Sequence, residues 1–204
     1  MLTLYGQVMS RAQRNLWLLE ELEVPFEHVK VNQNAGESRT PEFLKINPNG
    51  HVPVLKDGDT ILWETIAINW HIANKHGAGS MWPSDGIEQA QVMQWSLWMT
   101  TELEGLLVDY LRHAMVYPED KRDPSKVEAA LAGYPAAMKV LDDALQGRDY
   151  LVGDSFTLAD LNVASMMGLV DVYKQFDNSQ FPTAIAWLEK VLGRPARAKA
   201  MART

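Results

Sequence analysis

Residues 46–73 read INPNGHVPVLKDGDTILWETIAINWHIA, and two short apolar runs within them flank the dipeptide Asp57-Gly58. An Asp-Gly pair between apolar runs is typical of a β-hairpin. The residues after the hairpin repeat apolar side chains at helical spacing, and Thr65 stands before them as a candidate N-cap. This stretch therefore predicts two antiparallel strands followed by a helix that ends near His76-Gly77.

The residues before the hairpin predict a β-α-β unit. Residues 2–5 and 26–31 have the pattern of strands, and residues 10–23 between them have the apolar spacing of a helix that Pro25 terminates. Such a unit implies a parallel strand pair with a right-handed crossover. Thr40-Pro41 predicts the start of a short helix, with threonine as N-cap and proline at the first helical position. Residues 1–77 are thus expected to form an α/β domain with about four strands.

The segment GAGSMWPSDG (77–86) is rich in small residues and marks the expected domain boundary. Residues 87–204 predict an all-helical domain, beginning with a long helix over 87–117. On one face of that helix, Met99, Leu103, Leu106 and Tyr110 recur, a pattern that fits a core more often than a pocket. The chain is therefore expected to combine a small α/β domain with an all-α domain.

A further helix of this domain is predicted to start at Thr157 in SFTLADLNVASMMGLV. Thr157 and Asp160 have the spacing of a capping box, in which Asp160 takes the place of the usual Glu or Gln. We therefore expect Asp160 to serve the fold and not the chemistry.

Composition excludes several classes of function. The sequence has no cysteine, so a disulfide, a thiolate zinc site and a thiol nucleophile are all ruled out, and its five histidines show no metal-binding pattern. A net charge of −7 disfavours binding to nucleic acid. Apolar runs are too short to span a membrane, and MLTLYGQ lacks the features of a secretory signal, so a cytoplasmic protein is expected.

The stretch VMSRAQRNLWLLEEL (8–22) leaves the role of Ser10 open. Ser10 and Gln13 have the spacing of a capping box, which predicts that the hydroxyl starts a helix. A hydroxyl at a helix start can also take part in chemistry, and the local sequence does not choose between these roles.

Three stretches together resemble the cytosolic glutathione S-transferases. They are residues 46–73, residues 149–165 (DYLVGDSFTLADLNVAS) and residues 10–31 (SRAQRNLWLLEELEVPFEHVKV). The resemblance implies a thioredoxin-like domain over 1–77 that holds glutathione. It also implies a helical domain over 87–204 that supplies an electrophile pocket and the contacts of a homodimer. Glutathione would be a co-substrate, and no further cofactor or metal is implied.

The same resemblance assigns roles to residues of the hairpin segment. It implies a cis peptide bond at Val52-Pro53, with the backbone of Val52 paired to the cysteinyl part of glutathione. Glu64 and Thr65 would bind the ammonium and carboxylate of the γ-glutamyl end. His51 would face the glycine end, and Arg39 is a second candidate for that carboxylate.

Ser10 is expected to activate the glutathione thiol, because the pattern around it resembles serine-type, theta-like bacterial members of the family. A hydroxyl donated to sulfur stabilises the thiolate and lowers the thiol pKa, whose ordinary value is about 8.5. Tyr5 is the competing candidate, since tyrosine-type members use a phenol from that region. The absence of cysteine excludes a cysteine-type member.

The predicted function is a detoxifying glutathione transferase acting on small apolar electrophiles, with peroxide reduction or isomerisation as side activities. The alternatives are a glutathione- or ligand-binding protein without turnover and a dimeric interaction protein on the same fold. Fold alone does not distinguish these functions.

Overall fold

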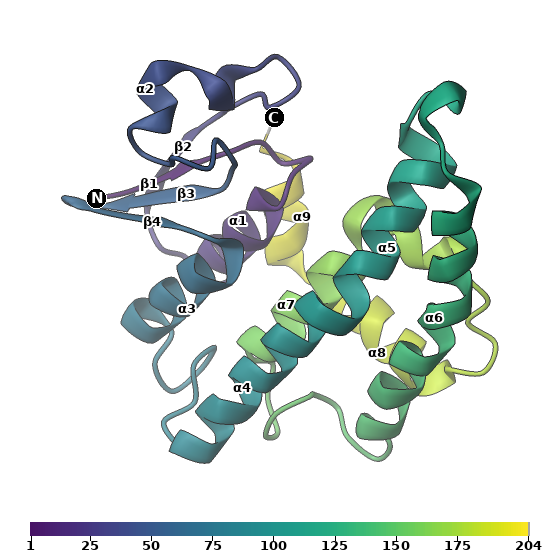
Figure 1. Ribbon diagram of the computed structural model, residues 1–204. Helices are drawn as coiled ribbons and strands as arrows, with labels where there is room; N and C mark the ends of the chain where they lie inside the picture. The colour runs from purple at the N-terminus through teal and green to yellow at the C-terminus, as the bar shows by residue number, and fades with distance from the viewer. Residues whose placement is uncertain (204) are drawn as a thin grey trace. The chain divides into compact units, whose positions relative to one another are not determined.

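Four short strands form one mixed sheet in the computed structural model, which describes residues 1–203 (Figure 1). The strand order is β2-β1-β3-β4, with β1 parallel to β2 and antiparallel to β3, and β3 antiparallel to β4. The strands are β1 (Leu2–Tyr5), β2 (Phe26–Val29), β3 (Val54–Asp57) and β4 (Thr60–Trp63). The predicted parallel pair and hairpin are confirmed.

Helices cover both faces of this sheet (Figure 1). The helices α1 (Ala12–Glu21) and α3 (Thr65–His76) pack against each other and against β1 and β3. The short helix α2 (Pro41–Leu44) lies on the other side, where Phe43 packs with Val52 and Val54. Thr40 caps α2 as predicted, because its hydroxyl accepts the Phe43 amide at 3.3 Å. The result is the predicted thioredoxin-like α/β domain.

The second part of the chain is helical, as predicted. Its α-helices are α4 (Gly86–Trp98), α5 (Glu104–Tyr110), α6 (Pro124–Ala144), α7 (Leu158–Met167) and α8 (Pro182–Leu192). Every residue of α7 is buried, and α7 contacts α4, α5 and α8. It is therefore the central helix of this unit.

The predicted long helix over 87–117 is less regular than its apolar spacing suggests. Two π-helical segments, Met99–Leu103 and Leu111–Val116, stand on either side of α5. Short 3₁₀ segments occur at Glu37–Arg39, Glu119–Lys121 and Leu169–Gln175. A wider helical turn changes which side chains share a face, and the apolar period of the sequence does not reveal it.

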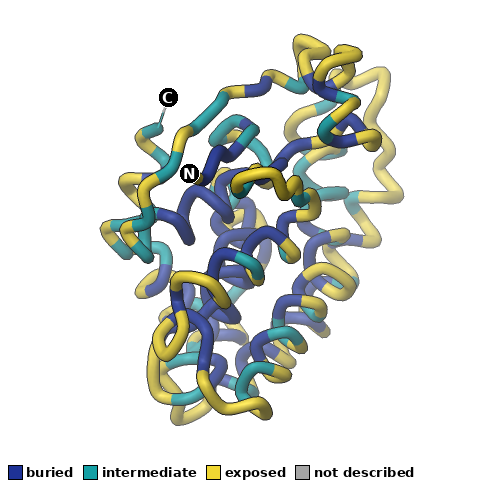
Figure 2. Tube along the Cα trace, turned by 90° about the vertical axis from the view of Figure 1, so that its left-hand side faces the viewer, coloured by how far each residue is buried: buried dark blue, intermediate teal, exposed yellow. Residues whose placement is uncertain are grey.

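The chain divides into two compact units, residues 1–84 with 193–204, and residues 85–192. The expected boundaries, 1–77 and 87–204, differ from this division at the C-terminus. The last helix, α9 (Pro195–Met201), packs against α1 and so belongs to the first unit. Within the described residues, exposed positions gather at turns and outer helix faces (Figure 2), and no helix is long and apolar enough to cross a bilayer.

Ion pairs hold the C-terminal segment to α1. Arg194 donates two hydrogen bonds to the Glu21 carboxylate, at 2.7 and 2.9 Å, and the Trp17 indole donates a third at 2.9 Å. Arg203 pairs with Glu20 and lies over the Phe26 ring. The basic C-terminal sequence thus neutralises carboxylates at the end of α1.

Replacing Glu21 with glutamine is expected to lower the free energy of unfolding by about 2 kcal/mol, because its side chain is only 8% exposed and loses a bidentate charged pair. Chemical denaturation measures this change. The control is Lys139→Ala, which removes a pair to Asp143 whose partners are 69% and 61% exposed. That change should cost less than about 0.5 kcal/mol. Equal losses of unfolding free energy in the two variants would show that the Arg194–Glu21 pair stabilises the protein no more than an exposed ion pair does.

Candidate functional site

The register of the sheet brings the predicted site residues to one end of it. Tyr5 pairs with Val29 and Val54, and Val54 pairs with Trp63, so these four residues form one row across the sheet. The segments that leave this row are the loop before α1, the Val52-Pro53 dipeptide and the Glu64-Thr65 turn. We call this end of the sheet the site end. The Asp57–Thr60 turn lies at the opposite end.

Gly6 allows the loop before α1 to approach the helix closely. Its φ is +148°, and a Cβ atom at this position would lie 2.5 Å from the Cβ of Ala12 and 3.4 Å from that of Val52. Any larger residue would push the loop away from both. The loop that carries Ser10 and the Val52-Pro53 dipeptide are therefore neighbours.

Ser10 is half-buried in this loop, and its hydroxyl makes two hydrogen bonds. It donates to the carbonyl oxygen of Gln7 at 2.6 Å and accepts the amide of Ala12 at 3.1 Å. The expected capping box is wrong: Arg11 is the N-cap of α1, and the Gln13 amide bonds to the Ser10 backbone carbonyl at 3.1 Å instead of to the hydroxyl. The Gln13 amide is therefore bonded within the first turn, and the Ser10 hydroxyl accepts the Ala12 amide instead.

Tyr5, the competing candidate, belongs to the core below the sheet. It is partly buried and packs against the cluster formed by Val31, Phe43, Val52 and Val54. This packing accounts for an aromatic residue at the end of β1 without a chemical role.

The Val52-Pro53 peptide bond is cis, as expected from the resemblance. Both residues are buried. The preceding turn is fixed by Asn47, whose side-chain amide donates to the His51 carbonyl at 2.8 Å and whose side-chain oxygen accepts the Asn49 amide at 3.0 Å. Asn47 therefore supports the Val52-Pro53 segment, and it was not among the predicted site residues.

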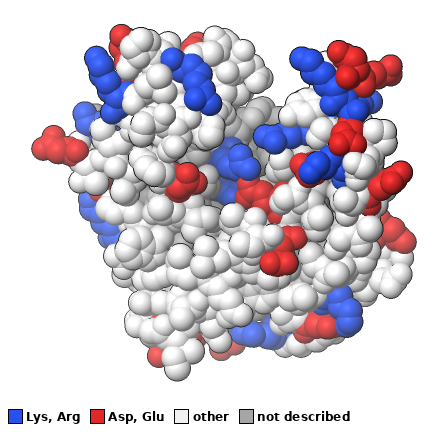
Figure 3. All heavy atoms as spheres, in the orientation of Figure 1, with Lys and Arg blue, Asp and Glu red and all other residues white. Residues whose placement is uncertain are grey.

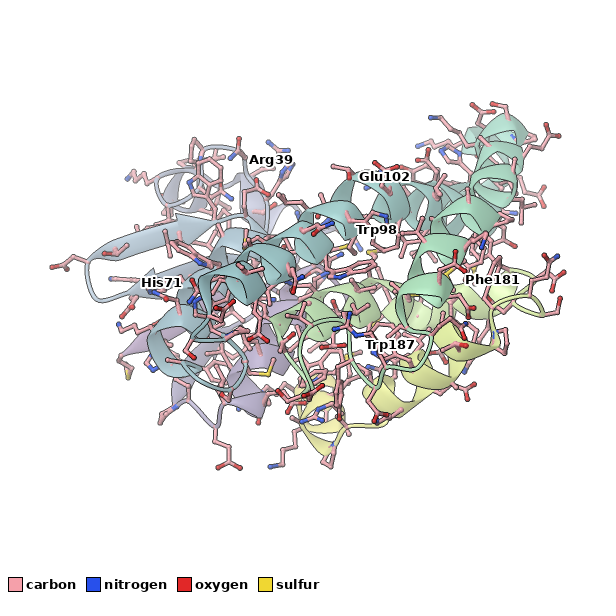
Figure 4. All side chains as sticks on the ribbon, turned by 90° about the horizontal axis from the view of Figure 1, so that it is seen from below. Arg39, His71, Trp98, Glu102, Phe181 and Trp187 are labelled. Carbon is pink, nitrogen blue, oxygen red and sulfur yellow. The ribbon has the colours of Figure 1, made fainter. Side chains whose placement is uncertain are left out.

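His51 and Arg39 lie together on the surface next to this turn. An Arg39 guanidinium nitrogen is 3.5 Å from Nε2 of His51, and both side chains are exposed (Arg39, Figure 4). Arg39 also covers Gly50, whose φ is +63° and where an added Cβ would lie 2.8 Å from the arginine Cδ. The two candidates for the glycine carboxylate are therefore adjacent.

Glu64 and Thr65 form the turn from β4 into α3. Glu64 is exposed and has φ 75° and ψ 120°, an unusual backbone conformation for a residue other than glycine. Thr65 was expected to cap α3, but Glu64 occupies the cap position and Thr65 is the first residue of the helix, where it is buried. The first amides of α3 favour an anion at the site end.

A charged group elsewhere on the hairpin lies outside the site. Asp57 pairs with Lys75 and, at 2.8 Å, with Nε2 of His71. The hydrogen bonds from Lys75 and then His71 lower the pKa of Asp57. This cluster holds α3 to the far end of β3 and does not reach the row that carries the site.

The second unit contains a groove of about 520 Å³ between the Met99–Leu103 segment and α6. Trp98, Glu102 and Leu106 line one side of it (Trp98 and Glu102, Figure 4). Met99 and Leu103 are fully buried, which confirms that they are core residues. Tyr110 also packs internally, with its ring 4.8 Å from that of Phe176.

In the part of the chain that the structure describes, neither a patch of like charges on the face shown nor a metal-binding group forms a second candidate site. On the face shown in Figure 3, basic and acidic side chains are interspersed. Among residues 1–203, no group of three His, Asp or Glu side chains could hold a metal ion. The polar groups at the site end remain the candidate for function.

Asn15 is a residue of this region to which the sequence reading gave no role. Its side chain is fully buried on α1 and reaches α3. A polar residue next to the apolar stripe of a buried helix was the available signal.

Two family models match the chain. The model for the glutathione S-transferase N-terminal domain matches residues 1–74, and the model for the C-terminal domain matches residues 103–195. Glutathione S-transferase GstB of Escherichia coli is 29% identical over 96% of this chain and 95% of its own length. A glutathione S-transferase of Hyoscyamus muticus is 34% identical over 97% of this chain and 96% of its own length.

Solved structures agree with the sequence matches. Glutathione S-transferase-I bound with lactoylglutathione has a TM-score of 0.88 and 30% identity, over 98% of each chain. The nitrogen regulation fragment of the yeast prion protein Ure2p also has a TM-score of 0.88, with 27% identity over 100% of this chain and 96% of that one. By its two domain models and its full-length relatives, the chain belongs to the glutathione S-transferase family.

Proposed function

We propose that the protein is a catalytic glutathione transferase of the serine type, similar to theta-like bacterial members. The observation that carries the proposal is the register row, which gathers the Ser10 loop, Val52-Pro53 and the Glu64-Thr65 turn at one end of one sheet. The charges and hydrogen-bonding groups of these residues suit the polar parts of glutathione.

Each part of the tripeptide has a partner in this arrangement. The carboxylate of Glu64 suits the γ-glutamyl ammonium, while the first amides of α3 and the Thr65 hydroxyl suit the adjacent carboxylate. The backbone of Val52 suits the cysteinyl amide groups. Arg39 and His51 suit the glycine carboxylate. With glutathione bound in this way, its thiol would lie near Ser10.

The proposed reaction is nucleophilic attack by the thiolate. The sulfur forms a bond to an electrophilic carbon, and either a leaving group departs with the electron pair of its bond or an addition product takes up a proton. Small apolar electrophiles are the proposed second substrates, and the proposed assembly is a homodimer, as the family resemblance implies. The match of full-length relatives named as transferases supports this chemistry.

The alternative is a protein that binds glutathione without turnover. The similar structures include the nitrogen regulation fragment of the yeast prion protein Ure2p and Ure2p in complex with glutathione. The present hydrogen bond from Ser10 to Gln7 also fits a purely structural serine. Turnover of a chromogenic aryl halide with glutathione distinguishes the two functions: measurable conjugation supports the transferase, and binding without conjugation supports the alternative.

Replacing Glu64 with glutamine is expected to weaken glutathione binding about tenfold, since a charge-assisted hydrogen bond to the ammonium becomes a neutral one. Isothermal titration calorimetry measures the dissociation constant. Asp59→Asn is the matched control, because Asp59 is also an exposed acid of the hairpin but lies in the turn at the opposite end of the sheet. Similar affinities for Glu64→Gln and Asp59→Asn would place the γ-glutamyl end elsewhere.

A further inference from the structure

Asn15 joins the two helices that present the site. Its Nδ2 donates to the backbone carbonyl of Thr65 at 3.1 Å and to Oδ1 of Asn69 at 2.6 Å. Asn15 lies on α1, which begins at the Ser10 loop, and both acceptors lie on α3, which begins at the Glu64-Thr65 turn. One side chain therefore connects the helix of the proposed thiol activator to the turn of the proposed γ-glutamyl site.

The position of Asn15 is one where packing alone would favour an apolar residue. Its side chain is fully buried, and its neighbours Leu16 and Trp17 on α1 are buried too. Burying an amide is costly unless its hydrogen bonds are made; the Asn15 Nδ2 makes two, while Oδ1 accepts none from the described residues. An apolar side chain would hold α1 and α3 together, but it would not fix how far one helix slides along the other.

Hydrogen bonds are directional, and apolar contacts are not. The hydrogen bond from Asn15 to the Thr65 carbonyl fixes the residue next to Glu64. Glu64 has a positive φ, which its surroundings must maintain. A shift of α1 along α3 would move Ser10 relative to Thr65, and a displacement of this kind disturbs binding geometry strongly.

We infer that Asn15 is a positioning residue, which sets the distance between the Ser10 hydroxyl and the Glu64-Thr65 turn through its bonds to α3. The inference rests on the proposed function, since it assigns both ends of one glutathione molecule to these two elements. Because Asn15 is buried, it acts through Thr65 and α1 and does not touch the tripeptide itself.

The test compares Asn15→Leu with Asn162→Leu. Leucine has the branched shape of asparagine and removes the donors without leaving a cavity, and its larger volume is matched in the two variants, which carry the same substitution at fully buried positions. Asn162 is a matched control, because it is also fully buried and donates from Nδ2, at 2.9 Å to the Ser96 hydroxyl, but it lies in the second unit. Melting temperature, glutathione affinity and the pKa of the bound thiol are measured for both variants and for wild type.

Asn15→Leu is expected to bind glutathione about tenfold more weakly and to raise the pKa of the bound thiol, whereas Asn162→Leu loses stability with both quantities unchanged. Equal effects of the two variants on affinity and thiol pKa would overturn the inference, because both would then reflect lost stability. If Asn15→Leu does not fold, Asn15→Ser is compared in the same way, since its hydroxyl is too short to reach both acceptors.

The wild type separates this inference from the proposed function. If wild type binds glutathione and Asn15→Leu binds it equally well, the positioning role is wrong and the transferase proposal stands. If wild type does not bind glutathione, the proposed function fails and the positioning role fails with it.

Discussion

Replacing Asp160 with alanine is expected to lower the free energy of unfolding by about 3–5 kcal/mol, the range found when one partner of a buried charged network is removed. Asp160 is fully buried and accepts four hydrogen bonds. Oδ1 accepts the Leu151 amide at 2.9 Å and the Trp187 indole at 3.0 Å, and Oδ2 accepts the amide and hydroxyl of Thr157 at 3.0 and 3.2 Å. All four donors would lose their partner.

This carboxylate does more than complete a capping box. It links the start of α7 to the Leu151 loop and to Trp187 of α8 (Trp187 is labelled in Figure 4). Burial raises the pKa of Asp160, while the hydrogen bonds from Thr157, Leu151 and Trp187 act in the opposite direction. The hydrogen-bond donors therefore offset the cost of burying the Asp160 carboxylate.

Urea unfolding monitored by circular dichroism measures the Asp160→Ala effect. Asp143→Ala is the control, since Asp143 lies exposed on α6 and makes one surface ion pair, to Lys139. Its loss should be below about 1 kcal/mol. A free energy of unfolding for Asp160→Ala close to that of the control would contradict the structural role.

Replacing Ser10 with alanine is expected to raise the pKa of the bound glutathione thiol by about one unit, which corresponds to about 1.4 kcal/mol of lost thiolate stabilisation. The Ser10 hydroxyl has one proton, and the carbonyl of Gln7 holds it at 2.6 Å in this structure. Activation requires the hydroxyl to turn from that carbonyl toward the sulfur. The bond from the Ala12 amide can persist during this change, because it uses a lone pair and not the proton.

The free energy favours the Ser10 hydroxyl when it exchanges the Gln7 carbonyl for the thiolate as its hydrogen-bond acceptor. A neutral hydrogen bond such as the one to Gln7 contributes about 0.5–1.5 kcal/mol, and one to a charged acceptor about 1.5–3 kcal/mol. The difference favours the thiolate, so binding of glutathione itself should release the hydroxyl. As the pH rises through the lowered thiol pKa, wild type should gain activity at a lower pH than Ser10→Ala.

Ultraviolet absorbance of the thiolate, followed against pH with glutathione bound, measures this change. Ser10→Thr keeps a hydroxyl and should stay near wild type, and Tyr5→Phe should leave the thiol pKa unaltered because Tyr5 packs in the core cluster. Conjugation of the aryl halide should fall about tenfold in kcat/KM for Ser10→Ala at neutral pH. If Ser10→Ala titrates like wild type and Tyr5→Phe does not, Tyr5 is the activating residue.

The local elements of this protein were determined by its sequence. The Asp57-Gly58 signal and its flanking runs predicted the hairpin, Thr40 predicted the start of α2, and the Thr157–Asp160 spacing predicted the start of α7. These features depend on residues close together in the chain, where spacing and side-chain type are enough. The family resemblance predicted the candidate site residues for the same reason, because its motifs are short and contiguous.

Only the tertiary structure decided which residues from distant parts of the sequence lie close together. Strand register placed Gly6, Pro53 and Glu64 at one end of the sheet, and the approach of α1 to α3 gave Asn15 its partners. The pairing of Arg194 with Glu21 joins the C-terminal segment to α1 within the unit formed by residues 1–84 and 193–204. Each of these contacts joins residues far apart in sequence, whose meeting depends on the packing of the whole unit, and no local pattern encodes it.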